Sequence, residues 1–141
     1  MPADPVAKII NPHPMKRQSG TRAISLVLQS ILYIAAGINH FLNPQVYRKI
    51  MPAYLPAHNL LISASGIIEI SLGIMLAFQP TRKLAACCII AMLLAFIPAH
   101  IEMIRISGCS FKDPCLAFAI AWLRLIPGQL LLIAWAWYQR K

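Results

Sequence analysis

Two charged residues stand inside long apolar runs of the sequence: Glu69 in the run 59–78 and Arg124 in the run 116–137. A run of about 20 apolar residues can cross a bilayer as one helix, and a charge near its centre costs about 3 kcal/mol or more. At roughly 1.5 Å per residue, Glu69 lies about 15 Å and Arg124 about 12 Å from the start of its run, so the two side chains lie at similar depths. The sequence favours a Glu69–Arg124 ion pair that locks two helices, with a protonatable site at Glu69 as the alternative.

A second polar group stands where the first and third apolar runs end. His40 ends the first run, while His100, Glu102 and Arg105 end the third, and the segment 51–56 is expected to lie over them. Glu102 and Arg105 are three positions apart on a helix and can simply pair with each other. His40 is a candidate ligand or proton-transfer group, and a hydrogen-bonded structural histidine is the alternative. We predict a polar pocket whose candidate residues are Asn39, His40, Glu69, His100, Glu102, Arg124 and Gln129.

Two of the four cysteines, Cys109 and Cys115, flank the connection before the last apolar run. Six positions with glycine and proline in the segment permit closure, and a disulfide would persist if this side faced an oxidising compartment. We therefore expect either a Cys109–Cys115 disulfide or two free thiols. Cys87 and Cys88 are adjacent and are expected to be buried as small residues. No spacing matches a zinc site and no Cys-x-x-Cys occurs, so no metal is expected.

The composition indicates what must position these side chains. The chain has 141 residues, of which 59% are hydrophobic and 12% charged, whereas soluble domains carry about 25% charged residues. Proline, glycine and asparagine separate four apolar runs at 23–42, 59–78, 84–104 and 116–137. We predict an all-α integral membrane four-helix bundle that contacts the lipid bilayer. The net charge of +9 does not indicate nucleic-acid binding, because the basic residues stand at the ends of the runs rather than on one amphipathic face.

The distribution of lysine and arginine predicts the orientation. The N-terminal tail, the second connection and the C-terminus share one side and hold eight basic residues, against four in the other two connections. By the positive-inside rule we expect both termini to lie in the cytoplasm. We expect the protein to lie in the inner, cytoplasmic membrane. Residues 1–22 contain four prolines and no apolar core, which is typical of a flexible basic tail rather than a signal peptide. Residues 23–141 form the single membrane domain.

Polar and small residues recur at helical spacing within the runs. In the first run they include Gln29, Tyr33, Gly37 and His40, and in the second Ser65, Gly66, Glu69 and Gly73. Such stripes let helices approach closely in lipid and turn polar groups toward protein. Pro98 and Pro127 lie inside the third and fourth runs, where each is expected to kink its helix and free a carbonyl group.

The chain resembles the DoxX-like family of small four-helix membrane proteins from about Arg22 to Trp137. The matching stretches are Gly37-Ile38-Asn39-His40-Phe41, Pro44, Met51-Pro52-Ala53-Tyr54-Leu55-Pro56, Ser65-Gly66-Ile67-Ile68-Glu69, Gly73, Pro98-Ala99, Leu123-Arg124-Leu125, Gln129 and Trp135. The resemblance implies the four-span fold. Some family members resemble a subunit of a thiosulfate:quinone oxidoreductase, and related proteins act in electron transfer, thiol redox or membrane-protein assembly.

Two positions depart from the family pattern. The family tends to have asparagine where this chain has His100. It also tends to read Arg-Leu-Pro-Leu-Gln, whereas one extra residue separates Arg124 from Gln129 here. On a regular helix that residue would turn Gln129 by about 100° away from the face of the arginine.

Three functions remain open at this stage. The first is a redox-linked membrane subunit that binds a quinone. Since one inward histidine is too few for haem and no iron–sulfur cysteine pattern occurs, any electrons would pass through a bound quinone or a partner redox subunit. The second is a non-catalytic scaffold or assembly factor, and the third is a small proton-coupled carrier acting as a homo-oligomer. No nucleophile elbow, phosphate loop or dinucleotide fingerprint indicates a soluble catalytic domain.

Overall fold

The computed structural model describes residues 20–110 and 114–140, and within these ranges it leaves out the side chains of 107–118. The described chain is helical throughout, apart from turns and connections. Its elements are α2 (Gly20–Leu42), α3 (Pro44–Ile50), α4 (His58–Ala77), α5 (Arg82–Ala95), α6 (Ile97–Ser110), α7 (Pro114–Leu123), the π-helical turn η1 (Arg124–Gly128) and α8 (Gln129–Gln139). The predicted tail lies almost wholly outside the described residues.

Four helical stretches are long and apolar enough to cross a membrane: Gly20–Leu42, His58–Ala77, Arg82–Ile106 and Ala119–Gln139. Each of them overlaps one predicted run. The prediction of an all-helical, multi-pass membrane protein is confirmed at this level. Large apolar side chains cover the outward faces and stay exposed in the isolated chain, as expected for surfaces that contact lipid; examples are Ile24, Leu60, Leu84 and Leu130.

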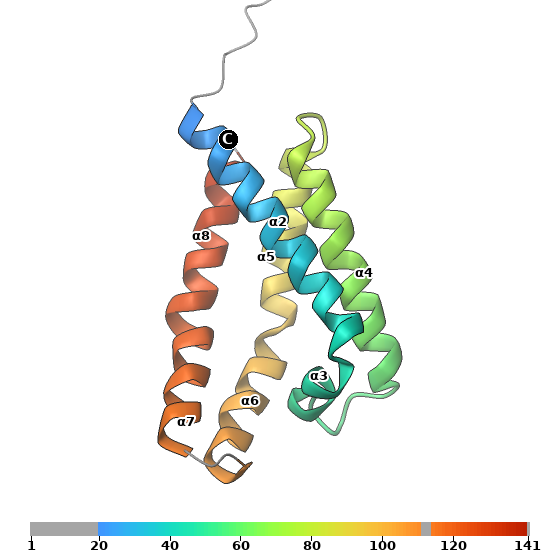
Figure 1. The fold of residues 1–141 in the computed structure, drawn as a ribbon, viewed down its shortest axis with the longest axis vertical. Coiled ribbons are helices and arrows are strands. Elements are labelled where there is room, and N and C mark those ends of the chain that lie inside the picture. The colour runs from blue at the N-terminus through green and yellow to red at the C-terminus, as the bar shows by residue number, and fades with distance from the viewer. Residues whose placement is uncertain (1–19, 111–113, 141) are drawn as a thin grey trace, which may run out of the picture.

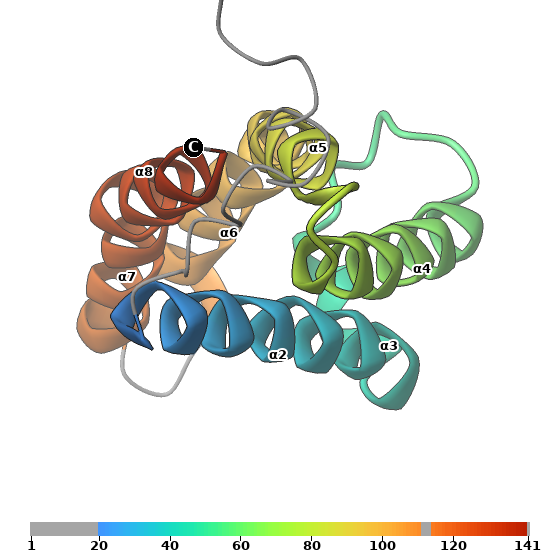
Figure 2. The same cartoon turned by 90° about the horizontal axis from the view of Figure 1, so that it is seen from above.

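The helices pack in a definite order. Helix α2 lies along α4, α4 also contacts α5, α5 contacts α8, and α6 contacts α7 (Figures 1 and 2). Gly20 and Arg140 lie at one end of the molecule, which we call the terminal end (Figure 1). The short helix α3 lies at the opposite end, the α3 end, where it contacts α2, α4 and α6.

Glycines explain the close contact between α2 and α4. A Cβ atom added to Gly37 would lie 2.6 Å from the carbonyl oxygen of Gly66, and one added to Gly66 would lie 2.9 Å from that of Gly37. One on Gly73 would lie 2.9 Å from the Ser30 carbonyl oxygen. Any side chain at these positions would push the helices apart, so the predicted stripes of small residues form the contact.

The third and fourth spans are both interrupted. Helix α5 ends at Ala95, Phe96 forms a turn, and α6 starts at Ile97 with Pro98 in its first turn, where a missing N–H group is tolerated. In the fourth span the turn η1 contains Pro127. The expected irregularities at both prolines are therefore present.

Candidate intramembrane pocket

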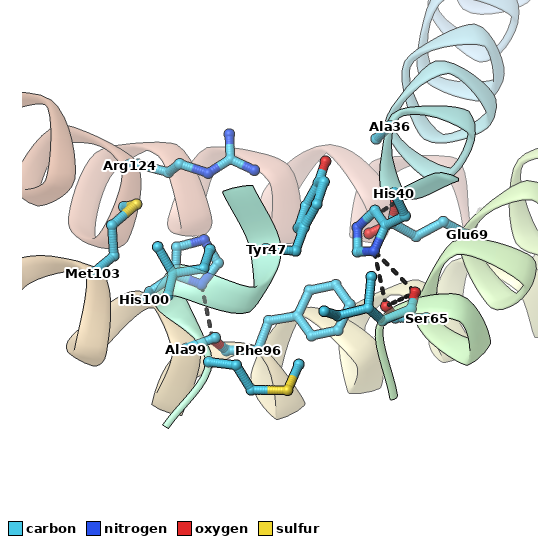
Figure 3. A pocket seen from close by; sticks show the side chains of 13 residues that line it. Ala36, His40, Tyr47, Ser65, Glu69, Phe96, Ala99, His100, Met103 and Arg124 are labelled. Carbon is cyan, nitrogen blue, oxygen red and sulfur yellow. Dashed lines mark hydrogen bonds and ion pairs between the residues drawn. The ribbon is translucent and has the colours of Figure 1, made fainter. Parts of the chain in front are cut away.

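His40 on α2 and Glu69 on α4 form a buried pair, with 7% and 5% of each residue exposed. The Nε2 atom of His40 lies 3.6 Å from Oε2 of Glu69. On the other side of the ring, Nδ1 donates to the Ile62 carbonyl oxygen at 3.1 Å and lies 3.0 Å from Oγ of Ser65 (Figure 3). Because the carbonyl group can only accept, Nδ1 carries a proton and Nε2 faces the carboxyl group. Either Nε2 of His40 or the carboxyl group of Glu69 can therefore carry a proton at this position.

Tyr47 on α3 packs against one face of the His40 ring. The two rings stack with centroids 3.7 Å apart and planes inclined by 26°. The tyrosine hydroxyl accepts a hydrogen bond of 2.8 Å from Asn39, whose carbonyl oxygen in turn accepts one of 2.7 Å from Asn43. Asn39 thus positions Tyr47 and does not line the pocket itself. The sequence prediction missed Tyr47, although Pro44 at the first position of a helix is the signal that could have located α3.

Two cavities meet at Glu69. The first, the capped chamber, has a volume of about 110 Å³ and lies beneath α3; its lining includes His40, Tyr47, Ile50, Met51, Ser65 and Met103. The second, the side chamber, has a volume of about 420 Å³; its lining includes Leu32, Tyr33, Leu93, Ile120, Leu123, Gln129 and Leu132. Both chambers are lined by Ala36, Glu69, Phe96, His100 and Arg124. The sequence predicted that residues 51–56 lie over His40 and His100; of that segment only Met51 lines the capped chamber, and α3 contributes Tyr47 and Ile50 instead.

The predicted ion pair between Glu69 and Arg124 is not formed among the described residues. Glu69 pairs with His40 instead, and Arg124 lines the same two chambers without an ion pair to a described residue. In the view of Figure 3, Tyr47 lies between the two side chains. The reason is the packing order: α4 packs against α2 and α5, whereas η1 packs against α6, α7 and α8. Similar predicted depth was therefore not enough for Glu69 and Arg124 to form an ion pair.

His100 and Glu102 separate in the structure although they are close in sequence. The Nδ1 atom of His100 donates to the Phe96 carbonyl oxygen at 2.8 Å, which leaves Nε2 for the chambers that this residue lines. Glu102 lines neither chamber and accepts two hydrogen bonds from Arg105, at 2.8 and 2.5 Å. Since the Arg105 side chain is 72% exposed, this is the interfacial pair that the sequence offered as the simpler explanation.

Gln129 lines the side chamber together with Arg124, and the 100° separation expected for a regular helix does not apply, because the helix is not regular here. The backbone N–H group of Gln129 donates to the Arg124 carbonyl oxygen, five residues back, which is the π-helical pattern. This wider turn absorbs the extra residue, so both side chains line the side chamber. The Gln129 amide also donates to the carbonyl oxygen of Leu93, in the last turn before the break in the third span. Side chains of this kind satisfy backbone groups at helix breaks in lipid.

Several buried polar atoms near the chambers have no hydrogen-bond partner among the described residues. They belong to Gln29, Ser30, Tyr33 and Glu69, each no more than 5% exposed. Tyr33 and Glu69 line the side chamber. Buried polar groups are nearly always satisfied, so these atoms indicate a site for water or a ligand. Gln29 and Tyr33 belong to the predicted stripe of α2, whereas Ser30 was missed.

The cysteine predictions have mixed outcomes. The side chains of Cys109 and Cys115 lie outside the described part of the chain, so the disulfide stays a prediction. Cys87 and Cys88 are free thiols, and Cys87 is exposed rather than buried because it faces outward from α5. Among the described residues, no three histidine, cysteine, aspartate or glutamate side chains gather closely enough to hold a metal ion.

Four apolar helices around a polar interior place the chain in the class of multi-pass membrane proteins. Comparison with known families makes this more specific. A family described as a domain of unknown function (DUF8561) matches residues 29–140, and the chain belongs to that family. No curated protein and no solved structure matches the chain.

Proposed function

We propose that this protein is a quinone-associated, redox-linked subunit of the DoxX-like type, a four-helix bundle in the inner membrane with both termini in the cytoplasm. The observation that carries the proposal is the side chamber, an apolar cavity of about 420 Å³ with Glu69, His100, Arg124 and Gln129 in its lining. Ligand sites are typically apolar cavities of roughly 300–1,000 Å³ with a few converging polar groups. The excess of basic residues on the side of the terminal end supports the orientation.

The chemistry of a quinone fits these groups. Its carbonyl oxygens accept hydrogen bonds, which Arg124 is free to donate within the described structure, whereas Nε2 of His100 can accept a hydrogen bond from a hydroxyl group of the quinol. Reduction of a quinone to a quinol takes up two electrons and two protons. The His40–Glu69 pair holds a proton at the junction of the chambers and can exchange it with the ligand. The proposal assigns the electrons to a partner redox subunit.

Purification in mild detergent followed by solvent extraction and mass spectrometry tests the proposal. We expect a co-purified isoprenoid quinone in the wild type and its loss in Ala36→Phe, because Ala36 lines both chambers. Ala35→Phe is the matched control, since its side chain is exposed on the adjacent position of α2. If the wild type carries no quinone and binds none when reconstituted with it, the proposal is wrong.

A non-catalytic scaffold is the second candidate, and the buried His40–Glu69 pair between α2 and α4 favours it. A purely structural pair would be needed for folding and not for ligand binding. Glu69→Gln separates the two functions. The scaffold is supported if Glu69→Gln unfolds the protein, whereas a folded Glu69→Gln that loses the quinone supports a ligand site.

A further inference from the structure

Among the described residues, the hydrogen bonds between the first and fourth spans lie at the terminal end. There Ser25 on α2 accepts hydrogen bonds of 2.8 Å from both Trp135 and Gln139 on α8, and Arg22 donates to the Gln139 carbonyl oxygen at 3.4 Å. Toward the α3 end the two spans diverge, as Figures 1 and 2 show. Extensive contacts of α2 are made with α4 and α3, and those of α7 with α6 and η1. The interface between the first and fourth spans is therefore open on one half of its length.

The side chamber lies in this open half. It is lined from α2 by Leu32 and Tyr33 and from the fourth span by Ile120, Leu123 and Leu132. Three of these side chains are also exposed at the outer surface, Leu32 by 42%, Ile120 by 54% and Leu123 by 63%. Residues from both spans thus contribute to the chamber wall and to the outer face at once. They form an apolar rim around an opening between the spans.

The depth of this rim in the membrane determines whether lipid or water contacts it. Leu32, Ile120 and Leu123 all lie within the stretches that are long and apolar enough to span a membrane. The opening therefore faces acyl chains rather than water. At the α3 end, by contrast, Tyr47, Ile50 and Met51 cover the capped chamber, and Asn39 and His40 hold Tyr47 in place.

We propose that the pocket is loaded sideways from the bilayer, through the opening between α2 and α7, by a molecule with a long apolar chain and a compact polar head. The head lies where the two chambers meet, accepts a hydrogen bond from Arg124, and donates one to Nε2 of His100 when it carries a hydroxyl group. The chain fills the side chamber and leaves through the rim into the lipid. The identity of the head as a quinone rests on the proposed function, whereas the route rests on the shape and apolar character of the opening.

A photoreactive chain without a quinone head tests the route by itself. The probe is a long-chain alcohol with a diazirine on the chain close to the hydroxyl group, so that the reactive carbon lies in the side chamber, added to proteoliposomes that contain the full chain. We expect labelling of Leu93, which is 4% exposed and lines the side chamber. Labelling confined to outward residues such as Leu130 and Leu131, with Leu93 unlabelled, would overturn the inference.

Closing the rim gives a second test. In a variant with all four cysteines replaced by alanine, Leu32→Cys and Ile120→Cys are joined by a flexible bismaleimide. We expect labelling of Leu93 to fall to background and uptake of a long-tailed quinone to stop. The matched control joins Ser25→Cys to Gln139→Cys, where the spans already touch, and both readouts should persist.

The outcomes separate the two proposals. Loss of chain labelling on closing the rim supports the route even if no quinone binds, and then only the proposed function fails. Unchanged labelling and quinone uptake after closing the rim would refute the route and leave the quinone site intact.

Discussion

The first two spans and the last two spans form two halves of the molecule that are built differently. Helices α2 and α4 are unbroken, with 23 and 20 residues, and meet through glycines. The third span breaks at Phe96, and the fourth widens into a π-helical turn at Arg124–Gly128. A hydrogen bond from Gln129 to the Leu93 carbonyl oxygen joins these two irregular spans. One half is thus held by close backbone packing and the other partly by polar contacts.

The pocket takes its residues from both halves, and the difference explains what each contributes. The regular half supplies His40 and Glu69, whose positions follow from straight helices in close contact. The irregular half supplies His100, Arg124 and Gln129, each next to a backbone break. Helix breaks at membrane depth are tolerated where they line a cavity, and π-helical turns often occur at functional sites. The difference between the two halves therefore favours a ligand site with a regular backbone on the side of α2 and α4 and an irregular backbone on the side of the third and fourth spans.

The largest effect is expected from overpacking the regular half. In Gly37→Leu the new side chain meets the Gly66 carbonyl oxygen and the backbone of Ile70. Because backbone atoms cannot move aside cheaply, we expect the free energy of unfolding to fall by about 3 kcal/mol, the upper end for overpacked cores. Titration with sodium dodecyl sulfate in mixed micelles, followed by circular dichroism, measures it. Gly20→Leu is the control, since no atom lies within 4 Å of an added Cβ there; equal stabilities would contradict the packing argument.

A smaller effect is expected from the polar contact of the irregular half. Gln129→Met keeps the length of the side chain and removes its hydrogen bond to Leu93. The Leu93 carbonyl oxygen still accepts from the Phe96 N–H group at 3.2 Å, so the loss should be about 1 kcal/mol. The same titration measures it, with Gln79→Met in the exposed second connection as the control. A variant as stable as the wild type would show that the third and fourth spans do not depend on this bond.

The two halves also differ in how far the sequence predicted them. Helical spacing placed Gly37, Gly66 and Glu69 on facing stripes correctly, because an unbroken helix keeps a constant angle per residue. The same rule failed across Arg124 and Gln129, since a π-helical turn changes that angle and leaves no clear signal besides Pro127. Helical spacing therefore predicted the side-chain positions correctly where the helices are regular.

The sequence predicted the depth of a side chain within its span better than it predicted the partner of that side chain on another span. Depth alone suggested Arg124 as the partner of Glu69, but depth does not say which helices are neighbours. The partner is His40, because α2 and α4 form the closest contact and the histidine lies one turn from Gly37. Tyr47 was missed for a related reason: a seven-residue helix between two prolines, Pro44 and Pro52, gives almost no periodic signal.

The smallest effect is expected within the irregular half but away from the chambers, at the Glu102–Arg105 pair on α6. Glu102→Gln removes one charge of a pair that lines neither chamber and whose two members lie three positions apart on the same helix. Ion pairs with one solvent-exposed member contribute little, because water solvates the Arg105 guanidinium, 72% exposed, and fixing the side chains costs entropy. We expect no measurable shift in the denaturation midpoint and unchanged quinone content on purification. A shift as large as that of Gln129→Met would mean that this pair on α6 also helps to hold the irregular half together, and that polar contacts contribute more to that half than the Gln129 bond alone.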